Sequence, residues 1–367
     1  MNNNDTFFSS GEYGCAMYPR IRCDGKISKS KNKFISKLSI DDFYTQNEYE
    51  ISQLVKKIKN NKNRFLYVTK KCYIKKKNIT EFKKKDCKVL DQYKNQSKYV
   101  LMYSRYKKSK QISKVFNENF SYKLLFSFYN FMLESIQLLC DNKIVHKDLH
   151  YGNILFDEDI KKFYIIDFGL SMTENNIYLD ANKTKINYYY LEKVLMTFDP
   201  SWERWSIEYH ILCFFIYKKT KLTTHDLTFI IDEYFQKNYV FNIIFPDINK
   251  YKKTVYNFYK KKFINNIDSE KHIIDIIINS MYTWDIYHLN YIILYTIYND
   301  GLEDELKTFV DLCIQGLHYD YTLRPSCLYF SKQTFYIVQQ YIKNKTMIKS
   351  KPRLNNMPTH LNTVIQN

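Results

Sequence analysis

The stretch that decides the fold reads IVHKDLHYGNILFD, from Ile144 to Asp157, and it is followed by FYIIDFGLS, from Phe163 to Ser171. The apolar runs ILF and YII are short, rich in β-forming residues and bounded by polar ones, so each predicts a short buried strand. A tight turn between them gives a small hairpin. We expect this hairpin to bring Asp148, Asn153 and Asp167 to one end.

Phosphoryl transfer needs such a set of groups. A carboxylate must accept the proton of the attacking hydroxyl, and an amide and a second carboxylate must hold Mg²⁺ on the nucleotide phosphates. Asp148 fits the first task, and Asn153 and Asp167 fit the second. The pattern H-x-D-x-x-x-x-N followed by D-F-G is among the more specific signatures that a sequence carries. A helix cap, a turn and a plain hairpin would account for the same residues without chemistry, but would not require all of them together.

On these motifs the chain resembles the protein kinase superfamily, in a divergent serine/threonine form. The resemblance implies an α+β, bilobal fold, with a β-rich N-lobe and a mainly helical C-lobe. It also implies ATP and Mg²⁺ as cofactors. We expect an N-lobe at 1–104, a C-lobe at 105–342 with an insert at 218–300, and a basic polar tail at 343–367.

The nucleotide-binding residues of the resemblance begin near the N-terminus. A kinase glycine-rich loop lets the backbone lie close over the phosphates. Here Gly11 and Gly14 fill two of its three glycine positions and Ser9 the first. Ala16 takes the place of the small residue that packs on adenine.

A lysine inside the predicted strand Phe34–Ile40 completes the phosphate site. Lys37 corresponds to the family lysine that contacts the α- and β-phosphates, with Lys33 in reserve. The family pairs this lysine with a glutamate on the next helix. Glu48 and Glu50 both lie on that predicted helix, and we prefer Glu48 narrowly.

The strand YVLMY resembles the one that leads to the hinge between the lobes. Met102 is the candidate gatekeeper. Backbone groups of Tyr103, Ser104 and Arg105 would then face the adenine. A buried Met102 is equally consistent with ordinary core packing.

The catalytic loop departs from common protein kinases at two positions. Lys147 replaces the usual Arg, so it keeps a charge that could meet an activation-loop phosphate but loses bidentate geometry. His150 replaces the usual Lys and would take over its γ-phosphate contact, whereas His146 is expected to pack and to hydrogen-bond. The sequence D-L-H-x-G-N is similar to haspin-like kinases and to small-molecule kinases of the aminoglycoside phosphotransferase type. The substrate class therefore stays open.

Further matches follow in the C-lobe. The amphipathic segment Phe120–Asn142 predicts the buried helix that supports the catalytic loop. The sequence ERWSI, which begins at Glu203, resembles the start of the central helix, with Glu in place of Asp; this change would loosen the anchoring of the catalytic loop. Arg324, in a D-x-x-x-R-P-S motif, is expected to form a buried pair with Glu192.

The polar segment 171–187 resembles an activation loop. Its candidate phosphorylation sites are Ser171, Thr173 and Thr184.

The chain has 367 residues, is 45% hydrophobic and carries a net charge of +18. A sizeable core is therefore available, and we do not expect wholesale disorder. The charge would attract acidic partners, nucleic acid or anionic membranes. A solvated lysine-rich face that reflects an AT-rich genome is the simpler interpretation, since no nucleic-acid-binding motif accompanies the charge. We expect protein substrates, acidic ones among them, no membrane or specific nucleic-acid partner, and a monomer.

The eight cysteines show neither C-x-x-C spacing nor a zinc pattern. No signal peptide or apolar stretch long enough to span a bilayer is recognisable. We therefore expect free thiols in a reducing compartment and a cytoplasmic protein. The compositional bias resembles kinases of large cytoplasmic DNA viruses, for which the host cytoplasm or the virion would be the location.

The function predicted from the sequence is ATP-dependent transfer of the γ-phosphate to Ser or Thr of protein substrates. One alternative is a small-molecule kinase, which His150 favours. Another is a pseudokinase that serves as a binding module, which the changes at Ser9, Lys147 and Glu203 favour. A nucleic-acid-binding protein is the most distant alternative.

Overall fold

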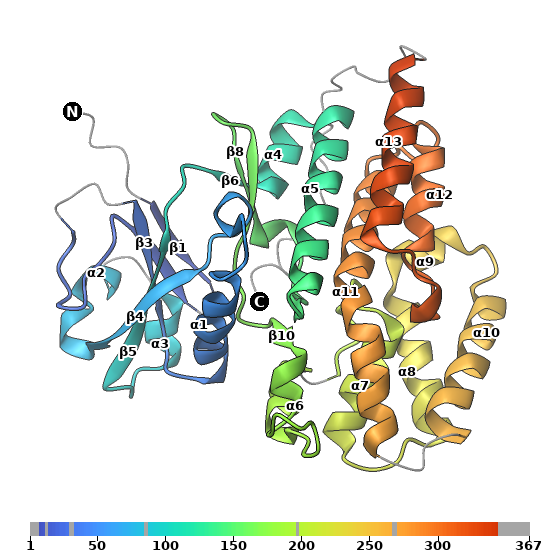
Figure 1. The fold of residues 1–367 in the computed structure, drawn as a ribbon, viewed down its shortest axis with the longest axis horizontal. Coiled ribbons are helices and arrows are strands. Elements are labelled where there is room, and N and C mark those ends of the chain that lie inside the picture. The colour runs from blue at the N-terminus through green and yellow to red at the C-terminus, as the bar shows by residue number, and fades with distance from the viewer. Residues whose placement is uncertain are drawn as a thin grey trace. The chain divides into compact units, whose positions relative to one another are not determined.

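The computed structural model describes residues 7–11, 14–28, 33–83, 87–195, 198–265 and 270–343. The chain forms two compact units. The sheet unit comprises the described residues up to Asn119 together with Tyr151–Ser171, and the helical unit comprises Phe120–His150 together with the described residues from Met172 onward. The N-terminal region is built on a β-sheet and the C-terminal part is mainly helical (Figure 1), so the α+β fold class expected of a kinase-like bilobal protein is confirmed.

The sheet unit contains a five-stranded antiparallel sheet with the strand order β1-β2-β3-β5-β4. Its strands are β1 (Phe7–Ser10), β2 (Cys15–Tyr18), β3 (Phe34–Ser39), β4 (Val68–Lys75) and β5 (Lys98–Arg105). Helix α1 (Phe43–Val55) follows β3, and its first turn is capped by Asp42, whose carboxylate accepts a hydrogen bond from the Thr45 amide at 2.8 Å. The cap fixes where the helix begins, and therefore which of its side chains face the sheet.

Both faces of this sheet are covered. On one face, Tyr49 of α1 packs against Val68, Val100 and Met102. On the other face, a larger core gathers around Leu38 and Leu101. That core includes residues of α2 (Thr80–Lys83) and α3 (Lys88–Gln92), two short helices in the connection between β4 and β5. Since side chains alternate along a strand, the two faces carry different residues and can serve different purposes.

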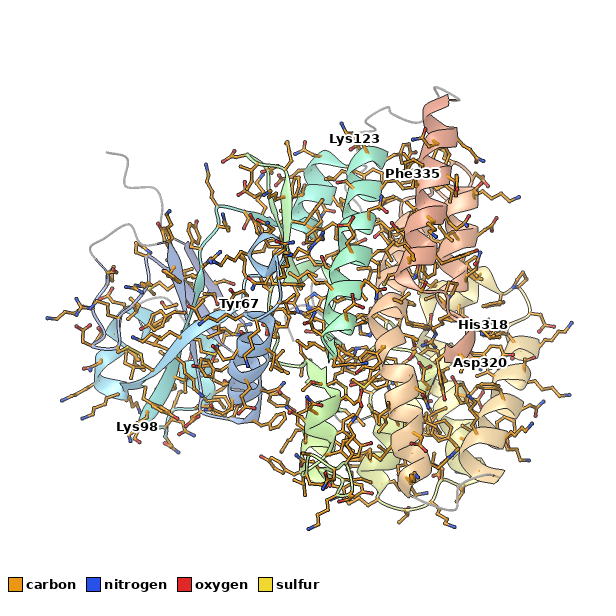
Figure 2. The ribbon with its side chains drawn as sticks, viewed as in Figure 1. Tyr67, Lys98, Lys123, His318, Asp320 and Phe335 are labelled. Atoms are coloured by element: carbon orange, nitrogen blue, oxygen red, sulfur yellow. A yellow bond between two sulfur atoms is a disulfide. The ribbon has the colours of Figure 1, made fainter. Side chains whose placement is uncertain are left out.

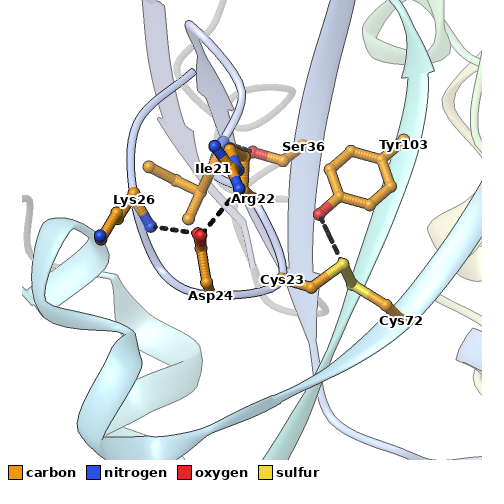
Figure 3. Close-up of a disulfide and its surroundings, with 8 residues drawn as sticks. All are labelled: Ile21, Arg22, Cys23, Asp24, Lys26, Ser36, Cys72 and Tyr103. Carbon is orange, nitrogen blue, oxygen red and sulfur yellow. Dashed lines mark hydrogen bonds and ion pairs between the residues drawn. A yellow bond between two sulfur atoms is a disulfide. The ribbon is translucent and has the colours of Figure 1, made fainter. Parts of the chain in front are cut away.

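Two disulfides cross-link the second face of the sheet. Cys15 on β2 is bonded to Cys87, and Cys23 to Cys72 on β4. Figure 3 shows the second bond, with the Tyr103 hydroxyl 3.5 Å from the Cys72 sulfur. The expectation of free thiols is therefore wrong for these four cysteines, because strand pairing brings residues together that are far apart in the sequence. The free cysteines among the described residues belong to the helical unit: Cys140, Cys213, Cys313 and Cys327.

The predicted hairpin is confirmed. Strands β8 (Ile154–Asp157) and β9 (Lys162–Ile165) pair in antiparallel register, with Ile154 opposite Ile165. The Ile166 amide donates to the Asn153 carbonyl at 3.0 Å, which extends the pairing by one step. Asn153 and Asp167 therefore flank the same end of the hairpin. Strand β6 (Lys110–Gln111) pairs with β8, and helix α4 (Ile112–Asn119) follows it.

The helical unit is organised around two long helices, α5 (Tyr122–Asp141) and α11 (Glu270–Asn299), which contact each other (Figure 1). The predicted supporting helix is thus confirmed as α5. The other helices are α6 (Tyr188–Val194), α7 (Ile207–Lys218), α8 (Thr224–Lys237), α9 (Tyr239–Ile244), α10 (Ile248–Lys260), α12 (Lys307–Gln315) and α13 (Cys327–Lys343).

A short antiparallel pair joins β7 (Ile144–Val145) to β10 (Met172–Thr173) within this unit. Most large side chains of the unit are buried, whereas Phe335 on α13 is exposed (Figure 2). In the described part of the chain, no helix is both long enough and apolar enough to cross a lipid bilayer.

Candidate active site

Four of the predicted nucleotide-site residues form a single row across the sheet. Ser9 lies opposite Ala16, Ala16 opposite Lys37, and Lys37 opposite Met102. Directly opposed residues of neighbouring strands project from the same face. The strand register therefore places these residues on the face that α1 covers, although they come from distant parts of the sequence.

Lys37 lies between two carboxylates. Its Nζ donates to Glu48 Oε2 at 2.8 Å and to Asp167 Oδ2 at 3.2 Å. Burial alone would lower the pKa of Lys37, but the charges of Asp167 and Glu48 outweigh it and hold the pKa above its usual value. The choice between the two helix glutamates is decided by geometry, because Glu48 is buried against the lysine and Glu50 is exposed. The reserve candidate Lys33 is also exposed and precedes β3.

Gly14 approaches β3 too closely for a side chain. A Cβ atom there would lie 2.8 Å from both the Leu38 carbonyl oxygen and the Ser39 hydroxyl. Gly11 donates its amide to the Gly14 carbonyl at 2.9 Å. The absence of a side chain at Gly14 is therefore a steric requirement of the fold.

The predicted hinge residues are still part of the sheet. Tyr103, Ser104 and Arg105 pair with β3, and the Tyr103 carbonyl accepts a hydrogen bond from Thr69 Oγ1 at 2.9 Å. The Tyr103 ring points to the second face, toward the disulfide of Cys72 (Figure 3). The first residue beyond β5 is Tyr106.

Asp167 adopts an unusual backbone conformation, with φ +64°. A non-glycine residue in the left-handed region costs of the order of 1 kcal/mol, so such a residue must be held by its surroundings. The Gly169 amide donates to Asp167 Oδ1 at 3.3 Å, and Asn47 of α1 donates to the Gly169 and Ser171 carbonyls at 2.9 and 2.8 Å. Sequence reasoning missed Asn47, which offers no motif beyond its place on the Glu48 helix.

Asn153 and Asp167 have the chemistry that a magnesium site needs. Both offer hard oxygen ligands, they flank one end of the hairpin, and the Asp167 side chain is 41% exposed. Mg²⁺ commonly uses one or two protein oxygens and takes the rest from phosphates and water. Among the described residues, no group of three or more His, Cys, Asp or Glu side chains gathers into a metal site. Asn153 and Asp167 therefore fit a metal that arrives with a nucleotide.

In the helical unit, Asp148 is flanked by two basic side chains. Arg204 Nη2 lies 3.4 Å from Asp148 Oδ1, and His150 Nε2 lies 3.7 Å from Asp148 Oδ2. Burial would raise the pKa of Asp148, but His150 and Arg204 overcome this effect and hold it well below its usual range. The buried His146 accepts a hydrogen bond from the Asp148 amide at Nδ1, at 3.3 Å. Asp148 is thus kept as a carboxylate.

The catalytic loop is anchored by a residue that sequence reasoning missed. Asp285 on α11 accepts hydrogen bonds from the backbone amides of His146 and Lys147, at 2.7 and 2.8 Å. Glu203 stands where the kinase pattern has the central-helix aspartate, and its larger side chain was expected to anchor the catalytic loop less firmly. Instead, Glu203 accepts from the Tyr291 hydroxyl at 2.5 Å and from the Tyr239 amide at 2.9 Å. The anchoring of the loop is therefore intact, because α11 rather than α7 supplies it.

Lys147 is not placed to receive a phosphate. It is 1% exposed, and its Nζ donates to the Val194 carbonyl and lies over the Tyr209 ring, 5.4 Å from its centre. Burial lowers the pKa of Lys147 to about 8. Of the three expected phosphorylation sites, Ser171 and Thr173 are buried, whereas Thr184 is exposed and donates to Asp180 at 2.7 Å.

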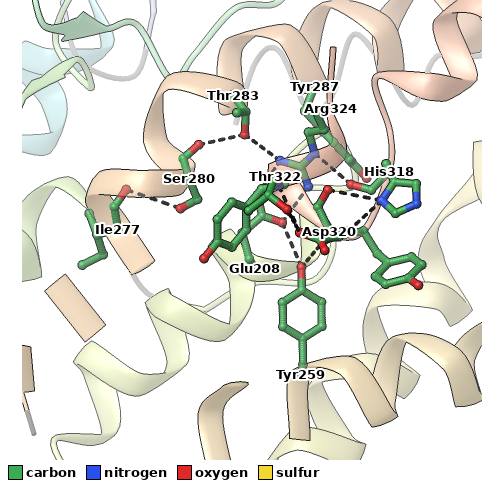
Figure 4. Close-up of polar contacts among 12 residues, drawn as sticks. Glu208, Tyr259, Ile277, Ser280, Thr283, Tyr287, His318, Asp320, Thr322 and Arg324 are labelled. Carbon is green, nitrogen blue, oxygen red and sulfur yellow. Dashed lines mark hydrogen bonds and ion pairs between the residues drawn. The ribbon is translucent and has the colours of Figure 1, made fainter. Parts of the chain in front are cut away.

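The expected pair between Glu192 and Arg324 is wrong. Arg324 binds Glu208 through two hydrogen bonds of 2.5 and 2.8 Å, and both side chains are fully buried (Figure 4). Glu192 instead pairs with Lys219 at the surface. The motif around Arg324 was recognised correctly, but its partner lies one helix later, at the start of α7.

These features are the ones expected of a protein-kinase-like protein: a lysine between two acids, a D-F-G aspartate beside a hairpin, and a separately anchored candidate catalytic aspartate. A comparison with protein families agrees, because residues 22–189 match the RIO domain, an atypical protein kinase family. The match spans somewhat less than half of the chain. It contains the candidate site residues Lys37, Glu48, Asp148, Asn153 and Asp167. It supports the assignment to the protein kinase superfamily, whereas no curated protein sequence matches the chain.

Proposed function

We propose that the protein is an ATP- and Mg²⁺-dependent protein kinase that transfers the γ-phosphate of ATP to Ser or Thr. Asp148 orients the acceptor hydroxyl and takes its proton. Lys37, held by Glu48, aligns the phosphates, while Gly14 lets the backbone approach them. Asn153 and Asp167 would hold Mg²⁺, which would neutralise charge on the phosphates. Positioning and electrostatics supply most of such catalysis.

The observation that carries this proposal is the ion cluster around Lys37. A partly buried lysine is shared by a helix glutamate and the D-F-G aspartate, at 2.8 and 3.2 Å, which is the arrangement that aligns nucleotide phosphates for transfer. The cluster therefore favours an active enzyme over a pseudokinase.

A protein acceptor, Ser/Thr specificity and a viral source complete the proposal. The high positive charge supports substrates with acidic surfaces. His150, where a lysine is usual, is the observation that favours a small-molecule acceptor instead.

Two measurements test the proposal. ATP with Mg²⁺ should raise the midpoint of thermal unfolding, because a ligand that binds only the native state stabilises it. ATP without the metal should raise it less. A panel of basic and acidic proteins and aminoglycoside-like alcohols then identifies the acceptor. Labelled phosphate on Ser or Thr supports the protein kinase. Transfer only to small alcohols would replace it with a small-molecule kinase, and no response to ATP would overturn it.

A further inference from the structure

Arg204 is a residue that neither the kinase motifs nor the RIO match accounts for. It lies between the expected activation loop and α7, outside the matched range. Its side chain is 9% exposed, and its Nη2 lies 3.4 Å from Asp148 Oδ1. An arginine carries its charge at every physiological pH. It is therefore a permanent cation at the carboxylate that the proposed reaction uses.

The segment around Arg204 is tied to the catalytic loop at a second point. The guanidinium lies over the Trp202 ring, 4.7 Å from its centre, and Trp202 stacks on Trp205 at 5.1 Å. The indole nitrogen of Trp205 donates to the Lys147 carbonyl at 3.1 Å. Lys147 directly precedes Asp148, so the segment contacts the loop at two adjacent residues, through Trp205 and through Arg204. These two contacts restrict the orientation of the Asp148 carboxylate.

Some buried polar atoms of Arg204 and His288 make no hydrogen bond within the described part of the chain. Within the described residues, Arg204 Nε has no hydrogen-bond partner, and neither ring nitrogen of the buried His288 on α11 has one. A buried donor without a protein partner does not add to the stability of the fold. Hydrogen bonding on this side therefore does not account for the arginine, whereas the contact with Asp148 does.

We propose that Arg204 is a positioning residue of the phosphotransfer reaction, which binds Oδ1 of Asp148 and so fixes the orientation in which the carboxylate receives the proton of the acceptor hydroxyl. The inference rests on the proposed function, because it assigns Asp148 the role of proton acceptor. The other carboxylate oxygen, Oδ2, lies 3.7 Å from His150 Nε2, so basic side chains from two segments flank Asp148.

Steady-state kinetics of the full chain test the inference, with ATP and a generic acceptor protein as the probes. Arg204→Met should lower kcat by about 10- to 100-fold, since misplacing a catalytic group by an ångström has effects of this size. KM for ATP should change by no more than about twofold, because Arg204 acts on the acceptor side. Arg204→Lys should recover part of kcat. Lys218→Met is the matched control; it removes a cation that pairs with Asp226 on α8, and it should leave kcat unchanged.

A double-mutant cycle separates positioning from a structural role. If Arg204 acts through Asp148, adding Arg204→Met to Asp148→Asn should cause no further loss of kcat. Losses that multiply, or a wild-type kcat in Arg204→Met, would overturn the inference. Thermal unfolding checks that each variant folds, and Arg204→Lys replaces Arg204→Met in the cycle if the latter does not. A wild-type chain that transfers no phosphate would overturn the proposed function itself, which is a distinguishable result.

Discussion

The two units hold their functional residues by different means. In the sheet unit, strand register aligns Ser9, Ala16, Lys37 and Met102, and two disulfides cross-link the face behind them. In the helical unit, buried charged side chains hold the functional residues in place. Asp285 binds backbone amides of the catalytic loop there, and the Arg324–Glu208 ion pair lies in the core.

The cysteines of the two units show the same contrast. The four in the described sheet unit are paired, whereas the four in the described helical unit are thiols. Burial raises the pKa of the Cys213 and Cys327 thiols to about 12, so these thiols are unreactive at neutral pH. The comparison teaches that the described sheet unit combines ionic with covalent links, whereas the described helical unit relies on ionic ones, and each kind of link can be broken separately.

The largest effect is expected from the buried ion pair of the helical unit. Arg324→Met leaves the Glu208 carboxylate buried without its partner, and should lower the free energy of unfolding by about 3–5 kcal/mol. Lys219→Met, which breaks the exposed pair with Glu192, should cost no more than about 1 kcal/mol. Denaturant titrations of both variants measure the difference, and equal losses would contradict a special role for the buried pair.

The disulfides are expected to contribute somewhat less. Replacing both Cys15 and Cys87 with Ser removes a link between residues 72 apart, which should lower the unfolding free energy by about 2–4 kcal/mol. A reductant should destabilise the wild type similarly, while Cys140→Ser should have little effect. A peptide map under non-reducing conditions checks the pairing directly. If iodoacetamide modified these cysteines in the native protein without reductant, the contrast between the units would fail.

The two glutamates of α1, Glu48 and Glu50, allow a matched comparison within the sheet unit, in which we expect a smaller effect. Glu48→Gln removes the carboxylate that binds Lys37 and should lower kcat/KM for ATP by about 10- to 100-fold, because the lysine loses its orientation. Glu50→Gln keeps the ion cluster and should stay within about twofold of the wild type. Phosphotransfer at limiting ATP measures both. A reversed order would show that the other glutamate serves Lys37.

The smallest expected effect is the contribution of Lys147 to the pH dependence of the unfolding free energy. In the folded protein its pKa is lowered to about 8, while an unfolded chain keeps the ordinary value of 10.5. Between these values the unfolded state holds a proton that the folded state has released, so stability from this group rises with pH above about 8. The gain should be about 1 kcal/mol between pH 8 and pH 9. Denaturation of the wild type and of Lys147→Met across this range measures it, and parallel pH dependences would contradict it.

Local patterns sufficed for some of the site. The hairpin strands follow from two short apolar runs, and the lysine within Phe34–Ile40 follows from its strand and from the glycines upstream. The choice between Glu48 and Glu50 required the direction of each side chain on α1, which the cap at Asp42 helps to set. Spacing alone does not contain that information, because both residues border the apolar stripe.

Contacts between distant segments could not be predicted from the sequence. Asp285 lies in a stretch without a recognised motif, and only the packing of α11 against β7 brings it to the catalytic loop. Glu208 was overlooked because Glu192 stands where the kinase pattern has the glutamate that pairs with this arginine. The disulfides join residues that have no short-range spacing signal, so their pairing depends on the sheet register. Each miss is a long-range partner of a locally recognisable residue.

Labelled ATP and one substitution from each unit test the central claim most directly. The wild type with Mg²⁺ should transfer label to Ser or Thr of an acceptor protein. Asp148→Asn should lower kcat by about 10²- to 10⁴-fold, as expected for a general base, and still be stabilised by Mg²⁺ and ATP against heat. Asp167→Asn should lose both transfer and that stabilisation. Transfer at the wild-type rate by Asp148→Asn, or unchanged metal dependence in Asp167→Asn, would contradict the account.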